Sequence, residues 1–275
     1  MSKDLIGMTE AGDAGLDLNW LNRLHNNLNA WDKPLGTDRY VGAILITKAG
    51  HRSQFQDAVK QLKLPCIIHF DCTGWGKTPM EPNAPNYVDL IDSLRHFISE
   101  GFPAERCVLR IDPIFPTKEG LNIATNVLRY AEVMLPDVKR VRISIYDDYH
   151  KSREEIIRRG YPPIDGITKW KNELERRPTS AQVRMVGETL ISLWPDFHFE
   201  VCAEPELANA YPDHFTWSGC LSKTDLDLMG IPLPDGIGVN GQNRFGCRCL
   251  TMKRELLDKK MRCPNNCAYC YWGRN

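Results

Sequence analysis

The sequence lacks any run approaching the about 18 consecutive apolar residues that span a membrane, so we expect a soluble protein. It also lacks an apolar signal segment at its N-terminus, which leads us to expect a cytoplasmic protein with reduced thiols. Neither sign of charge is in excess, because 35 Lys and Arg balance 35 Asp and Glu, and this removes any global case for electrostatic binding to nucleic acid. Internal repeats are lacking as well, so the 275 residues predict one large barrel-type domain or two smaller ones.

Cysteine, in contrast, is abundant: the chain has ten, half of them close to its C-terminal end. The last three, Cys263, Cys267 and Cys270, follow the spacing C-x3-C-x2-C. On a helix this spacing would place them on one face, where they could be core side chains. Pro264 and the two asparagines after it favour a turn, so a short loop around a metal fits better. Dense thiolates select zinc, copper(I) or an iron–sulfur cluster, and three ligands on a four-iron cluster leave one iron open.

This loop resembles the cluster loop of radical S-adenosylmethionine (SAM) enzymes, whose signature is C-x3-C-x-aromatic-C, with Tyr269 as the aromatic residue. The resemblance implies a [4Fe–4S] cluster on Cys263, Cys267 and Cys270. It further implies that SAM chelates the open iron and is cleaved to a 5'-deoxyadenosyl radical. Tyr269 would then lie near the adenine of SAM.

Four further cysteines, Cys202, Cys220, Cys247 and Cys249, end successive predicted strands or follow a loop rich in glycine and proline. We expect the four thiols to meet at one rim and to hold a second cluster, as an electron relay or a structural tie. Zinc would serve equally well as a structural tie. Alternatively, Cys247 or Cys249 could complete a four-thiolate zinc site with the three cysteines of the C-terminal loop. Buried free cysteine is the simplest alternative.

Short apolar runs alternate with longer amphipathic stretches, a pattern typical of parallel strands with crossover helices. The predicted strands are Leu5–Thr9, Val41–Lys48, Leu64–Asp71, Arg106–Asp112, Lys139–Tyr146, Phe197–Ala203 and Phe215–Cys220. The predicted helices are Leu16–Trp31, Ser53–Leu62, Tyr87–Glu100, Leu121–Leu135 and Ser180–Leu193, with a charged helix at Lys253–Arg262. Seven strands in this alternation fit an α/β fold, a full or partial (β/α) TIM-type barrel, better than an open sheet.

We assign residues 1–229 to the barrel and residues 230–275 to a cysteine-rich, cluster-binding segment packed on its rim. The polar insertion at residues 160–178 predicts an excursion or lid, and the strand that precedes Pro113 is expected to stop there.

Barrels of this type carry their functional groups at the carboxyl ends of the strands. Arg110 and Asp112 share a strand face, and a charged pair pointing into a barrel is costly unless it has a function, so we predict that both are catalytic. Lys48 is predicted to be catalytic as well. Either Lys48 or Arg110 could bind the carboxylate group of a ligand. Glu204 and Tyr146 are predicted to bind cofactor, and Glu204 or Asp112 would suit a hydroxyl or ammonium group. Helix capping or ion pairing better explains three other polar residues at strand ends, Asp13, Asp147 and His150.

The whole chain resembles an uncharacterised bacterial and phage family, a domain of unknown function that carries a radical-SAM-like cysteine cluster at its C-terminus. The matching pieces are, in chain order, Thr47-Lys48, Thr73-Gly-Trp-Gly76, Arg110-Ile-Asp-Pro-Ile114, Ile143-Ser-Ile-Tyr146 with Tyr149, Cys202-Ala-Glu204, Gly219-Cys220, Cys247-Arg-Cys249 and Cys263-x3-Cys267-x-Tyr-Cys270-Tyr271. One departure lies near the start, where the family has two arginines before Thr-Asp and this chain reads Glu10-Ala-Gly-Asp13. The resemblance implies a permuted radical SAM layout, because the cluster loop closes the chain instead of following the first strand.

We therefore expect an enzyme that uses one [4Fe–4S] cluster, or two, with SAM and an external electron donor. Its expected substrate is a nucleotide, a nucleic-acid base or a small polar metabolite, and the barrel would exclude water from a radical held beside one substrate C–H bond. The competing class is a non-catalytic protein in which zinc or a closed cluster ties the C-terminal segment to the barrel. A third class is an electron carrier that uses both clusters without SAM.

Overall fold

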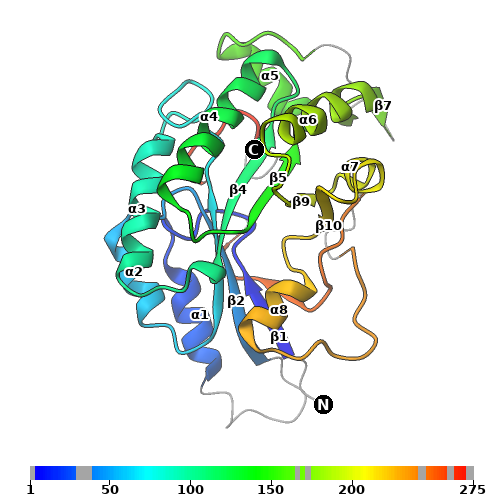
Figure 1. The fold of residues 1–275 in the computed structure, drawn as a ribbon. Helices are drawn as coiled ribbons and strands as arrows, with labels where there is room; N and C mark the ends of the chain where they lie inside the picture. Colours follow the sequence, from blue (N-terminus) through cyan, green and yellow to red (C-terminus); the bar gives the residue numbers. More distant parts are fainter. Residues whose placement is uncertain are drawn as a thin grey trace.

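The computed structural model describes residues 4–28, 39–164, 168–170, 175–240, 246–258 and 263–270. The ends of the predicted helices at 16–31 and 253–262, and Tyr271 after the last cysteine, lie outside these ranges. One large sheet forms the centre of the molecule (Figure 1). Its strands are β1 (Asp4–Met8), β2 (Arg39–Thr47), β3 (Cys66–Asp71), β4 (Cys107–Ile114), β5 (Val141–Ile145), β9 (Phe199–Cys202), β10 (Phe215–Ser218) and β11 (Lys253–Glu255).

Every neighbouring pair in this sheet is parallel, and the strands lie in the order β10-β9-β5-β4-β3-β2-β1-β11. The order follows the chain from β1 to β10, and β11 then pairs with β1 at the other edge. β10 and β11 are the two edge strands of this sheet. In the part of the chain that the structure describes, no ladder joins them, so the barrel is open between β10 and β11. The predicted α/β class with a mostly parallel sheet is confirmed, and the arrangement fits a partial barrel.

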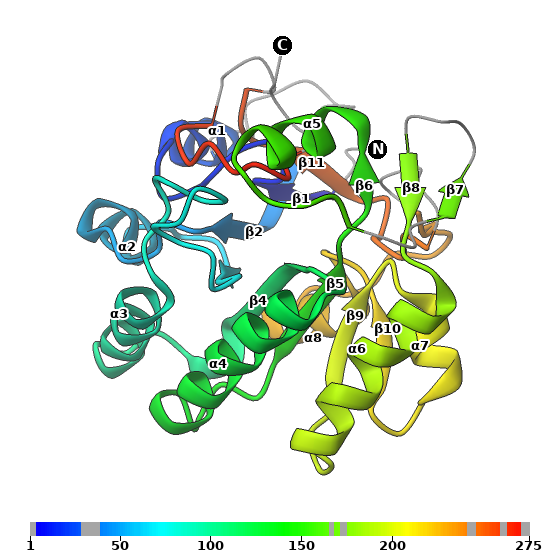
Figure 2. The same cartoon turned by 90° about the horizontal axis from the view of Figure 1, so that it is seen from above.

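Helices connect the strands and cover the sheet. They are α1 (Asn19–Leu28), α2 (Ser53–Lys60), α3 (Tyr87–Ser99), α4 (Lys118–Met134), α5 (His150–Arg158), α6 (Ser180–Leu193), α7 (Pro205–Ala210) and α8 (Lys223–Met229). Figure 2 shows α2, α3, α4 and α6 in a row along the outer side of the sheet. The side chains of Asn86, Thr117 and Thr179 cap α3, α4 and α6 by accepting a backbone N–H of the first turn. None of the helices among the described residues combines the length and apolarity that a bilayer crossing demands.

All seven predicted strands are present, but two predictions next to them are wrong. β4 does not stop before Pro113 and runs on to Ile114. The residues from Lys253 to Glu255, predicted to begin a charged helix, form β11 because they pair with β1. Neighbouring groups balance two of these charges. The Lys253 ammonium lies 2.6 Å from Glu10, and the Glu255 carboxylate accepts hydrogen bonds from two backbone N–H groups after β1. Residues 230–275 thus supply an edge strand to the sheet, and the domain boundary at residue 229 stays a prediction.

A small antiparallel sheet after β5 consists of β6 (Asp148–Tyr149), β7 (Thr168–Trp170) and β8 (Glu175–Arg177), in the order β6-β8-β7, and β7 and β8 lie in the predicted insertion at residues 160–178. It is joined to the rim of the large sheet through Arg177, which donates to the carbonyl of Ala203 at 2.9 Å. An excursion is therefore present, and its role as a lid stays a prediction.

A network of buried charges fills the interior of the large sheet. Arg140 contacts Glu200 at 2.7 Å and Asp225 at 2.8 Å. Arg142, which is fully buried, donates to Glu200 at 2.8 Å and lies 3.3 Å from Nε2 of His69. Burial disfavours the Glu200 carboxylate, but Arg142 and Arg140 outweigh burial and lower its pKa to about 2. The two arginine cations are therefore matched by a Glu200 carboxylate that stays ionised at neutral pH.

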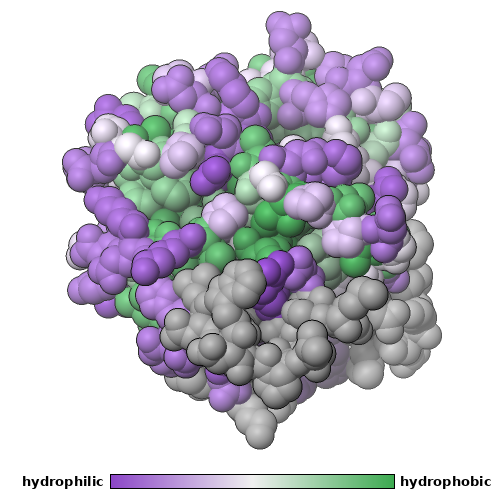
Figure 3. Space-filling view, turned by 90° about the horizontal axis from the view of Figure 1, so that it is seen from below, coloured by the Kyte–Doolittle hydropathy of each residue, from purple (hydrophilic) through white to green (hydrophobic). Residues whose placement is uncertain are grey.

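The face at the amino ends of the strands is largely apolar at its centre. Figure 3 shows hydrophobic side chains gathered there, with polar ones around them. A hollow of about 280 Å³ between α4 and α6 is lined mainly by apolar side chains, among them Leu128, Trp194 and Phe199. Its lining has few polar groups, so we place the chemistry at the opposite end of the sheet.

Replacement of Glu200 tests the interior network. We expect Glu200→Gln to lower the free energy of unfolding by about 3–5 kcal/mol at pH 7, because two buried arginines lose a carboxylate. Glu200 has a lowered pKa in the folded protein, so its contribution is complete above pH 4.5 and is lost as the pH falls toward about 2. Urea unfolding should therefore show the two proteins converging in acid. The exposed Glu105→Gln is the control, and an equal gap at both pH values would contradict the prediction.

Candidate functional site

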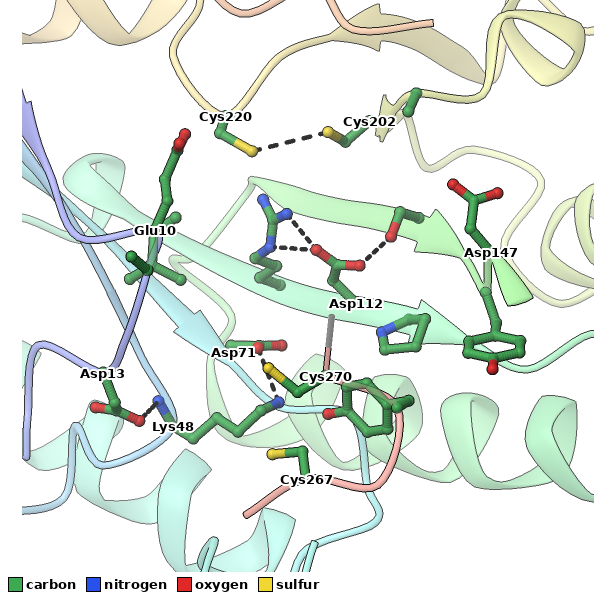
Figure 4. A pocket seen from close by; sticks show the side chains of 18 of the residues that line it. Glu10, Asp13, Lys48, Asp71, Asp112, Asp147, Cys202, Cys220, Cys267 and Cys270 are labelled. Atoms are coloured by element: carbon green, nitrogen blue, oxygen red, sulfur yellow. Dashed lines mark hydrogen bonds and ion pairs between the residues drawn. The ribbon is translucent and has the colours of Figure 1, made fainter. Parts of the chain in front are cut away.

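The carboxyl ends of the strands surround a cavity of about 190 Å³ (Figure 4). Every residue predicted from the sequence to have a role in catalysis, cofactor binding or metal binding lines this cavity: Lys48, Arg110, Asp112, Tyr146, Glu204, Tyr269, Cys202, Cys220, Cys247, Cys249, Cys263, Cys267 and Cys270. The parallel sheet explains this convergence, because it brings the carboxyl ends of its strands to one rim. The positions are thus established, and the individual roles stay predictions.

Hydrogen bonds hold the C-terminal loop on this rim. The side chain of Asn265 donates to the buried carboxylate of Asp13, which follows β1. Asn83 donates to the carbonyl of Pro264 at 2.7 Å, and the backbone N–H of Ala268 donates at 2.8 Å to a carbonyl in the loop after β3. The described residues of the segment form turns and not a helix, as predicted. The cysteine loop therefore faces the strand ends.

The Lys48 side chain lies where the C-terminal loop meets the strand ends. Its ammonium is 2.8 Å from Asp71 and 3.2 Å from Glu81, and it lies 5.7 Å from the ring centroid of Tyr269. Burial opposes its charge, but Asp71 and Glu81 outweigh burial and raise the pKa of Lys48 well above its ordinary value. Burial raises the pKa of the Cys267 thiol as well, and Lys48 opposes that rise. A thiolate at Cys267 would therefore have a cation beside it.

Sequence reasoning missed Glu81, although it organises this part of the site. Its carboxylate accepts hydrogen bonds from the hydroxyls of Thr73, at 2.6 Å, and of Tyr269, and it pairs with Lys48. Only 2% of its surface is exposed. Glu81 lies in the loop after β3, where it forms an isolated bridge with Gly76, and neither a strand end nor a motif marks it, so only the tertiary structure identifies it.

Arg110 and Asp112 form the pair that their shared strand face predicts. Nε of Arg110 donates to Asp112 Oδ2 at 2.9 Å, and the other oxygen of Asp112 accepts from the hydroxyl of Ser144. Burial opposes the Arg110 cation, but Asp112 and Cys220 outweigh burial and raise its pKa. One buried nitrogen of Arg110, Nη1, has no hydrogen-bond partner among the described residues, and the same is true of Oδ1 of Asp71. The cavity thus contains a donor and an acceptor that a ligand could satisfy.

Glu204 and Tyr146 form part of the cavity wall. Glu204 accepts the backbone N–H of Ile145 at 3.0 Å and lies 3.6 Å from Arg177. The Tyr146 hydroxyl donates to Asp148 at 3.1 Å, and burial raises the pKa of this tyrosine. Both polar groups are held by neighbours, which fixes the wall, and their contact with a cofactor stays a prediction.

The four remaining cysteines all line the cavity, and that they hold one metal centre stays a prediction. The sulfurs of Cys202 and Cys220 are 3.8 Å apart and point toward each other (Figure 4). The backbone N–H of Cys220 donates to Sγ of Cys249 at 3.0 Å, and the N–H of Cys249 donates to Sγ of Cys247 at 3.4 Å. Hydrogen bonds from Cys202 and Cys249 lower the pKa of Cys220 well below its ordinary value. The Glu10 carboxylate, Cys220 and Cys249 have donor atoms within 4.8 Å of one another.

Three polar residues at strand ends have the structural roles that the sequence favoured. Asp13 accepts the backbone N–H groups of Gly15 and Lys48, at 2.9 and 2.8 Å. Asp147 lies 3.3 Å from Arg177, and His150 lies 3.6 Å from Glu154 on the exposed surface of α5. These contacts agree with capping and ion pairing.

Comparison with known proteins adds a family match. A family model matches residues 35–272, a range that includes all seven cysteines of the cavity. The family is described as a domain of unknown function, DUF1848. No curated protein matches the sequence. Glu10 and Asp13, where the sequence departs from the expected pattern, precede the matched residues.

Loss of the Asn265 side chain tests the docking of the C-terminal loop. We expect Asn265→Ala to increase amide hydrogen exchange of residues 263–270 by about tenfold or more, because a buried hydrogen bond worth about 1–3 kcal/mol is lost. Exchange in β2 to β5 should not change. Asn122→Ala, on the exposed side of α4, is the matched control. Unchanged exchange of the loop would show that Asp13 does not hold it.

Proposed function

Since the chain belongs to the DUF1848 family, whose function is unknown, we propose that it is a radical SAM-type enzyme built on a (β/α) barrel of the TIM type. Cys263, Cys267 and Cys270 would hold a [4Fe–4S] cluster, and the strand ends would bind SAM and the substrate. The substrate class is a nucleotide, a nucleic-acid base or a small polar metabolite. An external electron donor would be required, and we propose a cytoplasmic location.

The observation that carries this proposal is that the three-cysteine loop and the strand-end polar groups line one cavity. A radical reaction needs a metal centre, its co-substrate and its substrate in contact inside a space that excludes water. A loop bound elsewhere on the surface would not meet this need. Here Asn265 and Ala268 anchor the loop to the rim, next to Lys48 and Arg110.

The residues present fit an iron–sulfur cluster. Thiolates are the ligands that such clusters prefer. Because each cysteine binds a separate iron, the cysteine sulfurs around a cluster stand farther apart than those around a single ion. Within the described ranges, the donor atoms of Glu10, Cys220 and Cys249 lie within 4.8 Å of one another, and the three cysteines of the loop are not part of that group. The ammonium of Lys48 would offset the negative charge of a thiolate-bound cluster.

When bound, the cluster would supply the electron that cleaves SAM to a 5'-deoxyadenosyl radical. Arg110 would donate its free Nη1–H to a carboxylate in the cavity, since that nitrogen has no partner among the described residues. Asp112 and Glu204 offer oxygens to a hydroxyl or ammonium group. Tyr269, whose hydroxyl is fixed by Glu81, would present its ring to the adenine.

A second candidate is a non-catalytic protein in which a metal fastens the C-terminal loop. The hydrogen bonds from the loop to Asp13 and to the turn after β3 favour it, because they join distant parts of the chain. An electron carrier without SAM is the third candidate. Cleavage of SAM distinguishes the enzyme from both.

Removal of single loop cysteines tests the cluster. We expect Cys263→Ala, Cys267→Ala and Cys270→Ala each to lose most iron and sulfide after anaerobic reconstitution, and to release at least about 100-fold less 5'-deoxyadenosine with SAM and dithionite. Cys66→Ala, inside β3, should retain both iron and activity. A wild-type protein that holds iron and does not cleave SAM would favour the electron carrier.

Substitution of Arg110 tests the binding of the carboxylate. Arg110→Lys keeps the charge and removes the guanidinium donors, so we expect SAM or substrate to bind about 10- to 100-fold more weakly, with iron content unchanged. Isothermal titration of the reconstituted protein under nitrogen would measure this. Arg95→Lys, on the exposed side of α3, is the control. Equal affinity for every ligand would remove Arg110 from the proposed role.

A further inference from the structure

Four cysteines lie at the opening between the two edge strands of the large sheet, β10 and β11. Cys202 ends β9 and Cys220 follows β10, so these two stand on one side of the opening. Cys247 and Cys249 belong to the segment that leads to β11, on the other side. Backbone pairing across the opening is sparse: the N–H of Leu250 donates to the carbonyl of Leu221 at 3.0 Å. The thiols therefore bridge two parts of the sheet that no strand ladder joins in the described residues.

Glycine allows the two sides to approach this closely. A Cβ atom on Gly219 would lie 2.4 Å from the backbone nitrogen of Cys249, a distance that no side chain can occupy. Gly246, with φ of 68°, has a left-handed backbone, and a Cβ there would lie 2.8 Å from the carbonyl oxygen of Ala203. Both glycines are adjacent to one of the cysteines. The backbone is thus shaped to bring the four sulfurs together.

The spacing of one sulfur pair, Cys202 and Cys220, matches the edge of a tetrahedral site around one ion. With zinc–sulfur bonds of about 2.3 Å, the edges of a tetrahedron of four sulfurs measure about 3.8 Å. Cys202 and Cys220 are 3.8 Å apart, and the donor atoms of Cys220, Cys249 and Glu10 all lie within 4.8 Å of one another. Ligands of a [4Fe–4S] cluster are attached to separate irons, so they stand farther apart than this.

The surroundings suit a site with a net negative charge. The Lys253 ammonium lies 2.6 Å from Glu10 and balances the charge of that carboxylate beside Cys220 and Cys249. Arg110 lies among the neighbouring cations and is nearly fully buried. The backbone N–H groups of Cys220 and Cys249 donate to sulfur, an arrangement that stabilises thiolates.

We propose that Cys202, Cys220, Cys247 and Cys249 bind one zinc ion in a tetrahedral site that ties β10 to the segment before β11. The site is closed, with four protein ligands, so its role is structural. It forms one wall of the cavity without taking part in electron transfer. The inference is independent of the cluster on the C-terminal loop.

The test separates the two metal sites by using a triple variant, Cys263→Ala, Cys267→Ala and Cys270→Ala together, as the parent. The full-length chain is purified without chelators from medium supplemented with zinc and iron, and its zinc, iron and acid-labile sulfide are measured. We expect about one zinc per chain and neither iron nor sulfide in this parent. Adding Cys220→Ala or Cys249→Ala should reduce bound zinc at least about tenfold, whereas adding Cys66→Ala should not.

A second measurement covers the case in which those variants fail to fold. The folded parent is stripped of metal, titrated with zinc alone, and alkylated, and each cysteine is followed by mass spectrometry. Zinc should protect Cys202, Cys220, Cys247 and Cys249 together, and Co²⁺ should give the absorption of a tetrahedral thiolate site. Iron with sulfide in the parent would overturn the proposal in favour of a second cluster. Unprotected thiols after zinc addition would overturn it in favour of free cysteines.

Discussion

The buried ammonium of Lys48 is the contact on which the site depends. It comes from the end of β2 and meets the end of β3 through Asp71, the following loop through Glu81, and the C-terminal loop through the ring of Tyr269. Each partner alone would leave an unbalanced charge in a space with little water. Together they keep the cation ionised and fix the cysteine loop against the strand ends. The charges at the strand ends therefore add to the hydrogen bonds that position the loop.

Much of the fold could be predicted because its strands are short apolar runs and its helices carry an apolar face. β3, for example, is buried almost throughout, and α6 was predicted with its observed ends. β11 could not be predicted, since Lys253, Arg254 and Glu255 have the composition of an exposed helix. What makes them a strand is pairing with β1, at the opposite end of the sequence. Local propensity contains no information about such a partner.

The candidate site shows the same division. The cysteines and the polar strand ends could be found because parallel strands bring their carboxyl ends to one rim. The distinction between the two cysteine sets could not, since it rests on sulfur spacing and on the charge of Lys253 and Glu10 beside Cys220 and Cys249. Glu81 was missed because a lone carboxylate in a loop looks solvent-exposed until the chain folds over it.

The return of the chain's end to its beginning constrains how the protein is made. Asn265 bonds to Asp13 across 252 residues of sequence, and β11 joins the sheet only beside β1. On a ribosome, the first strand therefore waits for its outer neighbour until residues 253–255 have been made. A nascent chain can bury β2 to β10 early, but its cavity stays without one wall until residues 246–270 emerge. A chain without residues 246–270 would therefore have a sheet that lacks β11 and a cavity that lacks its cysteine loop.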